Sequence, residues 1–426
     1  MKKIIIFIDS HNDLDNILPF IDYVLLSHKV KIILYKVKGS DLIGCKGHLE
    51  YLKNTYNIVP ANYDKNFSKQ YAFLMKIYWV LLKYARRAKQ KSYLLPFLIL
   101  IIRFNSVVSY LTQREVRKNQ RELDADVIMI DFGKELGLYG AEIVNYSQNK
   151  KVTVVGYLHG FSIYTNLDVL QKDKAIISDF KRFILKLAKS QNNRKYCDRY
   201  VVGIEQRETY FSSSMMSNYD VNYLNRVYEV GVPRYATEWI AKYRNNIMKS
   251  NSFTYGENNR INVVLFMSHP QYNVQIDALM DTIKELFRCK KINFVYKPHT
   301  RNGLDRIKSK EIKGYDATNI SSLELSAWAD VGIVYGSSIA FQLLQDDVPL
   351  IMPRYVHLNS TIFEKNEVCI TVDSLSDLVD IFSYSKGEIY KMVSQDKVKS
   401  FIQHYVYGNE DYNNLMKNFY NSTVGT

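Results

Sequence analysis

The sequence predicts an α/β protein built from two Rossmann-like domains that face a common cleft. Short apolar runs alternate with helical segments on both sides of a polar stretch at 241–260, and each run is too short for an independent helix. This alternation is typical of parallel sheets with crossover helices. At 426 residues the chain is also long for a single hydrophobic core. We therefore expect an N-terminal Rossmann-like domain at 1–240, a linker at 241–260, a second Rossmann-like domain at 261–385 and C-terminal helices at 386–426.

The first domain is expected to open with a strand at 4–8, a helix at 17–27, a strand at 31–35 and a helix at 44–56. The loop after the first strand is rich in Asp, Asn and His. Ligands of open α/β sheets bind beyond the carboxyl ends of the strands. Asp9 is therefore a candidate catalytic group, and His11 and Asp13 are candidate acceptor-binding groups. The alternative is a solvated turn in which an Asp or Asn caps the following helix.

Polar residues also follow two later strands, expected at 127–130 and 151–157. The first strand ends in Asp131-Phe132-Gly133-Lys134-Glu135, and the second leads into His159-Gly160. A His-Gly pair directly after a buried strand turns the backbone and directs the imidazole toward the cleft. Asp131 and His159 are therefore candidate proton acceptors, with a structural role as the alternative for His159, and Glu135 is a candidate acceptor-binding residue. A helix at 167–192 and strands at 199–204 and 228–234 are expected to complete the domain.

A basic helical insertion is expected at 66–122. The chain has a net charge of +14, and this segment carries much of it together with many aromatic and aliphatic side chains. Its longest apolar run, 94–102, contains Pro96 and is too short to span a bilayer. Two interpretations fit: the insertion lies on an anionic membrane surface, or it packs its apolar side on its own domain. No segment resembles a nucleic-acid-binding motif, so we expect no nucleic-acid partner.

The second domain is expected to contain strands at 261–267, 292–296, 330–335, 348–352 and 368–372. Three of these strands end in groups suited to a phosphate or diphosphate, namely Ser268-His269-Pro270, Lys297-Pro298-His299 and Gly336-Ser337-Ser338. A cation, an imidazole and a small-residue turn at the start of a helix form a suitable cradle for such an anion. The candidate donor-binding residues are Lys297, His299, Gly336, Ser337, Ser338 and His269.

Further polar residues of the second domain could complete the donor site. Glu364 is a candidate to hold the donor ribose, with simple surface exposure as the alternative. For His269 the alternative is a helix cap that fixes a turn. His357 and Asn359 follow the strand at 348–352 and could line the same pocket.

Several enzyme classes are excluded by motifs that the chain lacks. It has no GxGxxG fingerprint, no Walker A loop and no GxSxG elbow, which argues against dinucleotide redox chemistry, ATP hydrolysis and a serine nucleophile. Its four cysteines form no CxxC pair, so we expect free thiols in a reducing, cytoplasmic compartment. No acidic pair suggests a divalent ion, and we expect no cofactor. The chemistry that fits is group transfer from a nucleotide-activated donor to a hydroxyl, with a phosphate as leaving group and a base for the acceptor proton.

Short motifs in both domains resemble those of the bacterial GT-B glycosyltransferases of surface-polysaccharide synthesis. Lys297-Pro298-His299 resembles the Lys-Pro-His-Pro motif of capsule, sialic and Kdo transferases, with Thr300 in place of the second Pro, and Gly336-Ser337-Ser338 is similar to their paired Ser/Thr motif. Residues 227–234 resemble the segment that closes the acceptor domain in many members. His159-Gly160 matches a His-Gly of the teichoic-acid glycerophosphotransferases. The resemblance implies that His299 contacts the donor phosphate and that His159 is the base.

These observations favour a cytoplasmic glycosyltransferase, peripheral at the inner face of the plasma membrane, that builds lipopolysaccharide or capsule. The expected donor is a nucleotide-sugar, with CMP-linked Kdo-like or sialic-like sugars favoured, and the expected acceptor is a glycan or glycolipid. One alternative is a CDP-glycerol or CDP-ribitol phosphotransferase. Others are a non-catalytic glycan- or nucleotide-binding protein and a UDP-sugar epimerase of the same fold.

Overall fold

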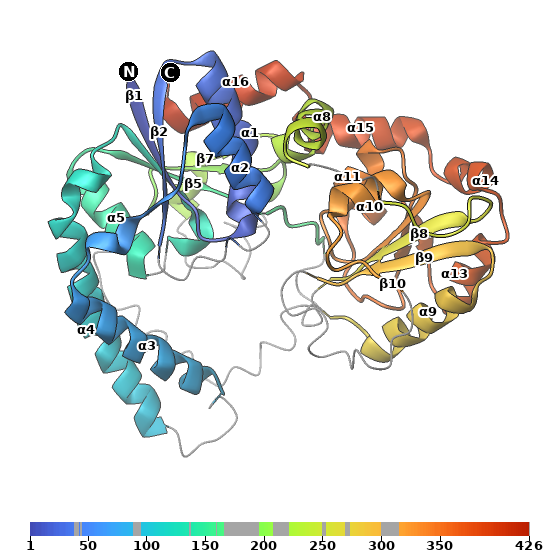
Figure 1. The fold of residues 1–426 in the computed structure, drawn as a ribbon, viewed down its shortest axis with the longest axis horizontal. Coiled ribbons are helices and arrows are strands. Elements are labelled where there is room, and N and C mark those ends of the chain that lie inside the picture. The colour runs from blue at the N-terminus through green and yellow to red at the C-terminus, as the bar shows by residue number, and fades with distance from the viewer. Residues whose placement is uncertain are drawn as a thin grey trace.

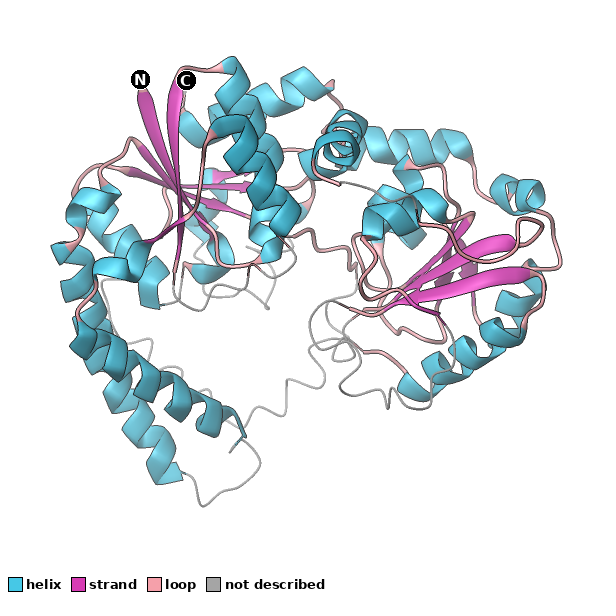
Figure 2. Ribbon diagram, viewed as in Figure 1, coloured by secondary structure: helices cyan, strands magenta, loops and turns pink. Residues whose placement is uncertain are grey.

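Two parallel β-sheets, each covered by helices, form the body of the protein (Figure 1, Figure 2). The computed structural model describes residues 1–37, 42, 45–87, 95–135, 138–158, 160–165, 196–207, 221–248, 253–268, 273–299 and 315–425. Each sheet alternates with its helices along the chain, so the predicted pair of Rossmann-like units is confirmed. The helix expected at 167–192 lies outside the described residues.

The first sheet has the strand order β3-β2-β1-β4-β5-β6-β7, with all neighbours parallel. Its strands are β1 (Lys2–Phe7), β2 (Val30–Lys36), β3 (Ala61–Asn62), β4 (Val127–Asp131), β5 (Thr153–Tyr157), β6 (Arg199–Val202) and β7 (Val227–Glu229). Helices α1 (His11–Ser27) and α2 (Lys46–Tyr56) contribute to the core on one face. Helix α5 (Leu138–Asn149) contributes to the core on the other face.

Helix α1 begins six residues earlier than the sequence predicted, so the expected polar loop after β1 is largely helical. Ser10 is its N-cap: the Ser10 hydroxyl accepts from the Asp13 backbone N–H, and the Asp13 carboxylate accepts from the Ser10 N–H. This reciprocal capping box satisfies backbone donors that a helix start leaves unpaired. His11 and Asp13 therefore lie in the first helical turn, where the N-cap is Ser10 and not an Asp or Asn, and the Asp13 side chain is buried.

The insertion forms two antiparallel helices, α3 (Lys69–Arg87) and α4 (Leu95–Lys118), that extend away from the body of the first domain (Figure 1). Tyr71, Met75 and Tyr78 of α3 are buried in a core that also contains Val108 and Val116 of α4. These positions recur every three or four residues, which places them on one face of each helix. The insertion is thus helical as predicted.

The second sheet has the order β10-β9-β8-β11-β12-β13 and is also entirely parallel. Its strands are β8 (Ile261–Phe266), β9 (Ile292–Lys297), β10 (Tyr315–Asp316), β11 (Val331–Val334), β12 (Leu350–Pro353) and β13 (Ile370–Val372). The helices of this unit are α9 (Ile276–Arg288), α10 (Ser322–Trp328), α11 (Ala340–Gln345), α12 (Ile362–Lys365) and α13 (Leu375–Ile381).

Helices α8 (Thr237–Asn246) and α16 (Tyr412–Val424) tie the two units together. Helix α8 occupies the first part of the predicted linker, so residues 241–246 are not a flexible connection. Its Lys242 pairs with Asp22 of α1 (2.6 Å), and its Arg244 pairs with Asp346 beside α11 (2.6 Å). The chain then ends in α14 (Lys386–Lys391), α15 (Gln395–Tyr405) and α16, which packs back onto the first domain.

Candidate functional site

The Gly336-Ser337-Ser338 turn after β11 is closely packed. Gly336 has φ of +63°, and a Cβ at this position would lie 2.6 Å from the Tyr164 hydroxyl and 2.9 Å from Ser268 Oγ. Both hydroxyls donate to the Gly336 carbonyl oxygen, Ser268 at 3.2 Å and Tyr164 at 3.3 Å. Only glycine combines this left-handed backbone with so close an approach.

The two serines of the turn lie between the domains. Tyr235, just after the last strand of the first domain, donates its hydroxyl to Ser338 Oγ (2.9 Å). Ser338 Oγ accepts this bond, so its own hydrogen can be directed to a ligand oxygen. Ser337 Oγ accepts a longer bond from the Ile339 N–H (3.5 Å). Two hydroxyls therefore stand at the carboxyl end of β11, where a phosphate was predicted.

Lys297 ends β9 and is buried, with its ammonium group held by backbone carbonyls. Nζ donates to the carbonyl oxygens of Thr318 (2.7 Å), Ala317 (3.1 Å) and Ile320. Burial lowers the pKa of Lys297 to about 8. Lys297 thereby fixes the segment before α10, a partnership that the sequence did not predict. His299 follows at the same edge and is half-buried.

His357 and Asn359 lie next to the Gly336 turn, as their position after β12 predicted. His357 Nδ1 donates to the Asn359 carbonyl (3.2 Å), since a carbonyl oxygen can only accept. His357 Nε2 lies 3.1 Å from where a Cβ on Gly336 would be, and its ring stacks on Tyr164 at 5.6 Å between centroids. The Asn359 side chain accepts from Asn273 (2.9 Å). The buried side chains of His357 and Asn359 thus form a hydrogen-bonded polar cluster beside the turn.

The segment after β5 crosses from the first domain to the second. Tyr164 forms an isolated antiparallel bridge with Thr361, and the Ile362 N–H donates to the Ile163 carbonyl (2.8 Å). His159 lies outside the described residues, but β5 ends two residues before it and Gly160 follows it in the described chain. Tyr164, which contacts the predicted phosphate turn, therefore follows the predicted base by only five residues in the sequence.

Three predicted carboxylates gather at the carboxyl edge of the first sheet. Burial raises the pKa of the Tyr157 hydroxyl well above its ordinary value, and the nearby charges of Asp13, Asp131 and Asp9 add to the shift. Asp131 caps a short 3-10 helix by accepting from the Gly133 N–H (2.9 Å). Asp9 lies 3.6 Å from the Lys134 ammonium. Asp9 follows β1 and Asp131 ends the neighbouring strand β4, so both lie at the carboxyl edge of the sheet.

A second charged group on the first domain was only partly predicted. Asp15 of α1 pairs with Arg234 (2.6 Å) and with His48 of α2 (3.1 Å), and these charges hold the pKa of Asp15 well below its ordinary value despite its burial. His11 packs edge-on against His48 at 5.3 Å between ring centroids. Burial lowers the pKa of His11, which favours a neutral imidazole at neutral pH. The signal available for Asp15 was its place four residues after His11 on one helix face.

Three other predicted site residues have different surroundings. The Glu135 carboxylate is completely buried and accepts from the Cys197 N–H and the Tyr200 hydroxyl (2.6 Å), so it connects the segment after β4 to β6 and the residues just before it. The Glu364 carboxylate accepts from the Thr361 N–H (2.7 Å) as part of a capping box and from Arg354 (3.0 Å). His269 lies outside the described residues.

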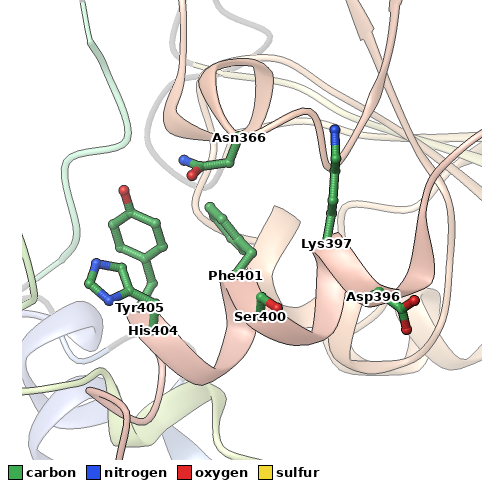
Figure 3. A pocket seen from close by; sticks show the side chains of 7 residues that line it. All are labelled: Asn366, Asp396, Lys397, Ser400, Phe401, His404 and Tyr405. Carbon is green, nitrogen blue, oxygen red and sulfur yellow. The ribbon is translucent and has the colours of Figure 1, made fainter.

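A surface hollow on α15 contains none of the predicted site residues (Figure 3). It is lined by Asn366, Asp396, Lys397, Ser400, Phe401, His404 and Tyr405. Within the part of the chain that the structure describes, no group of three or more His, Cys, Asp or Glu side chains is arranged to hold a metal ion.

No protein-family model and no curated protein matches this sequence. Solved structures do match along nearly the whole chain. The glycotransferase of kitacinnamycin aligns with a TM-score of 0.54 and 10% identity over 99% of this chain and 99% of that chain. A UDP-GlcNAc 2-epimerase from Neisseria meningitidis, bound to UDP-GlcNAc, aligns with a TM-score of 0.52 and 8% identity over 95% of this chain and 99% of that chain. At these identities the likeness shows the fold, which is the two-domain GT-B arrangement.

Proposed function

We propose that the protein is a nucleotide-sugar-dependent glycosyltransferase that moves a sugar to a hydroxyl of a glycan acceptor. The observation that carries this proposal is the contact between the Gly336 turn and Tyr164. It joins the edge of the second domain, which is rich in groups suited to phosphate, to the segment that follows β5 in the first domain. Such a junction suits transfer from a donor held by one domain to an acceptor held by the other.

On the donor side, the leaving group is a phosphate whose negative charge grows in the transition state. Ser337, Ser338 and His299 would donate hydrogen bonds to it, because preorganised donors stabilise developing charge. Lys297 would contribute the positive charge of its buried ammonium group. Because that group already donates its hydrogen bonds to backbone carbonyls, Lys297 would act by charge and by holding the 317–320 segment in place. His269 and Glu364 complete the proposed donor site, Glu364 through the helix start that it caps.

On the acceptor side, a base must accept the hydroxyl proton as the new glycosidic bond forms. Asp9, Asp131 and His159 are the proposed candidates, because all three follow the carboxyl ends of parallel strands in one sheet. His11 and Asp13 would help to bind the acceptor from the first turn of α1. Glu135 would contribute to acceptor binding indirectly, by holding the segment after β4 in place through its hydrogen bonds to Cys197 and Tyr200.

The resemblance of the Lys297-Pro298-His299 and Gly336-Ser337-Ser338 motifs supports a finer proposal. The donor would be a CMP-linked Kdo-like or sialic-like sugar, and the product would be lipopolysaccharide or capsule made at the cytoplasmic face of the membrane. The reaction would need no metal ion.

Nucleotide binding tests this proposal first. We expect CMP to raise the melting temperature of the purified protein, because a ligand that binds only the folded state stabilises it by about 2.7 kcal/mol at roughly 100 times its Kd. His299→Ala should lose this rise, whereas His404→Ala, on the surface of α15, should keep it. A thermal-shift series with CMP, CDP, UDP, UMP, GDP and ADP provides the measurement. A rise with UDP or GDP alone would exclude the cytidine donor, and no rise with any nucleotide would argue against the transferase.

Product analysis then separates the remaining alternatives. A glycosyltransferase releases CMP only when a sugar appears on the acceptor. A glycerol or ribitol phosphotransferase also releases CMP, but it transfers an alditol phosphate. An epimerase would isomerise a UDP-sugar without any acceptor, and a binding protein would turn over no donor.

A further inference from the structure

One face of helix α3 in the α3–α4 hairpin is buried by packing against α4 and its own domain. At its base, Glu115 of α4 accepts from the Ser68 N–H just before α3 (2.9 Å). One turn further along, the hydroxyls of Tyr71 and Thr112 are hydrogen-bonded at 2.9 Å. Met75 and Tyr78 continue this buried seam toward α4. The position of α3 is therefore determined by packing along this face.

The opposite face of α3 exposes a second apolar stripe. Phe73 is 63% exposed, Ile77 37% and Val80 52%. They are spaced by four and three residues, so they lie in one row along the helix. Trp79, one residue before Val80 in the sequence, is 52% exposed. A folded soluble protein rarely leaves a contiguous row of large apolar side chains in water unless the row binds something.

The charge of the hairpin indicates what the row binds. Residues 69–118 contain eleven Lys and Arg and one acidic residue, a net charge of +10 within a chain of +14. The single acid is Glu115, which is buried and bonded at the base. Lys69 and Lys76 are exposed and lie on the same side of the helix as Phe73, because they come four residues before it and three residues after it. The partner must therefore be anionic and must accept apolar side chains.

We propose that the α3–α4 hairpin docks on an anionic phospholipid bilayer, with Phe73, Ile77 and Val80 in the interface and Lys69 and Lys76 at the headgroups. A surface that is both acidic and apolar matches this face, as for helices that lie in the plane of a membrane. A second copy of the chain does not match it, because two faces of the same strong positive charge repel each other. Docking would be interfacial, since no helix in the described part of the chain is long and apolar enough to cross a membrane.

This inference rests on the proposed function only in one respect: membrane docking would place the proposed active site near a lipid-linked acceptor. Vesicle binding by the full chain, measured without any donor, tests it separately. We expect sedimentation with vesicles of phosphatidylcholine and phosphatidylglycerol, little with phosphatidylcholine alone, and weakening by added salt. Phe73→Ser/Ile77→Ser/Val80→Ser and Lys69→Gln/Lys76→Gln should each lower binding roughly tenfold.

Matched variants away from the hairpin control for apolar area and charge. Tyr384→Ser/Met392→Ser removes exposed apolar side chains, and Lys399→Gln/Lys417→Gln removes the same charge from α15 and α16. Both should bind vesicles as the unaltered protein does, and circular dichroism should show that every variant is folded. Equal binding to neutral and anionic vesicles would overturn the proposal. So would full binding by either hairpin variant, or a lipid-free dimer that the apolar variant dissociates.

Discussion

Gly336 is a position at which both the backbone and its neighbours require glycine. Its φ of +63° costs a residue with a Cβ about 1–2 kcal/mol. An added methyl group would also press on the hydroxyls of Tyr164 and Ser268. We expect Gly336→Ala to lower the free energy of unfolding by at least about 1–2 kcal/mol. The variant should also weaken nucleotide binding by about tenfold or more, a cost of about 1.4 kcal/mol, because the turn that carries Ser337 and Ser338 must shift. Urea unfolding and nucleotide titration measure the two effects.

Gly387 in α14 is the matched control for that substitution. A Cβ at Gly387 would meet nothing within 4 Å, and its backbone is helical. Gly387→Ala should therefore keep nucleotide binding and gain up to about 1 kcal/mol of stability. Equal nucleotide affinity in both variants would contradict the role of the Gly336 turn.

At this scale the sequence predicted positions better than partners. Residues such as Ser338, His299 and Asp131 were placed correctly at strand ends, because an apolar run followed by polar residues shows where a strand stops. The carbonyls that hold Lys297 lie 20 or more residues further along the chain. Tyr235 comes from the other domain. Such contacts depend on tertiary packing, which residue patterns do not record.

Among the elements, the start of α1 decides where His11 and Asp13 point. Ser10 caps this helix through the bond that its hydroxyl accepts from the Asp13 N–H (3.3 Å). Ser10→Ala should cost about 1 kcal/mol, the usual value of a lost N-cap. It should also reduce kcat/KM for the acceptor, because the first turn that carries both residues loosens. Thermal unfolding and initial rates at limiting acceptor measure these effects.

Ser374, which caps α13 in the second domain, offers the comparison. Its hydroxyl accepts from the Asp377 N–H at 3.1 Å. Ser374→Ala should cost a similar free energy and leave acceptor kinetics unchanged. If both variants slowed the reaction equally, the loss would reflect stability alone and not the geometry of α1.

Strands were predicted more accurately than helix starts because their signal is continuous. Runs such as 261–266 and 292–297 are rich in apolar, β-branched and aromatic side chains, whereas α1 begins with three polar residues, His11, Asn12 and Asp13. The polar residues of a capping box lack the hydrophobic periodicity that predicts a helix, so this pattern alone predicts a loop there. The same reasoning applies to α8, where the polar pattern of 241–246 predicts a linker: its exposed residues carry little apolar pattern, and its ion pairs reach two domains.

For the whole molecule, the return of α16 to the first domain is the feature that local patterns could not predict. Leu415, Met416 and Phe419 join a core that includes Ile4 and Ile6 of β1, more than 400 residues earlier in the chain. Helix α8 contributes Trp239 to the same core. The core of the first domain is thus completed by residues that follow the second domain in the chain.

Phe419→Ala tests this dependence. The Phe419 side chain is almost fully buried and packs against Phe20 of α1 at 4.8 Å between ring centroids. Its removal should cost about 3–5 kcal/mol, through lost burial and the cavity that remains. Urea unfolding followed by circular dichroism and tryptophan fluorescence should show an earlier transition. Lys417→Ala, on the exposed side of the same helix, should stay within about 0.5 kcal/mol of the unaltered protein. If Phe419→Ala unfolds no earlier than Lys417→Ala, then α16 is not part of the first domain's core, and the domain folds without the end of the chain.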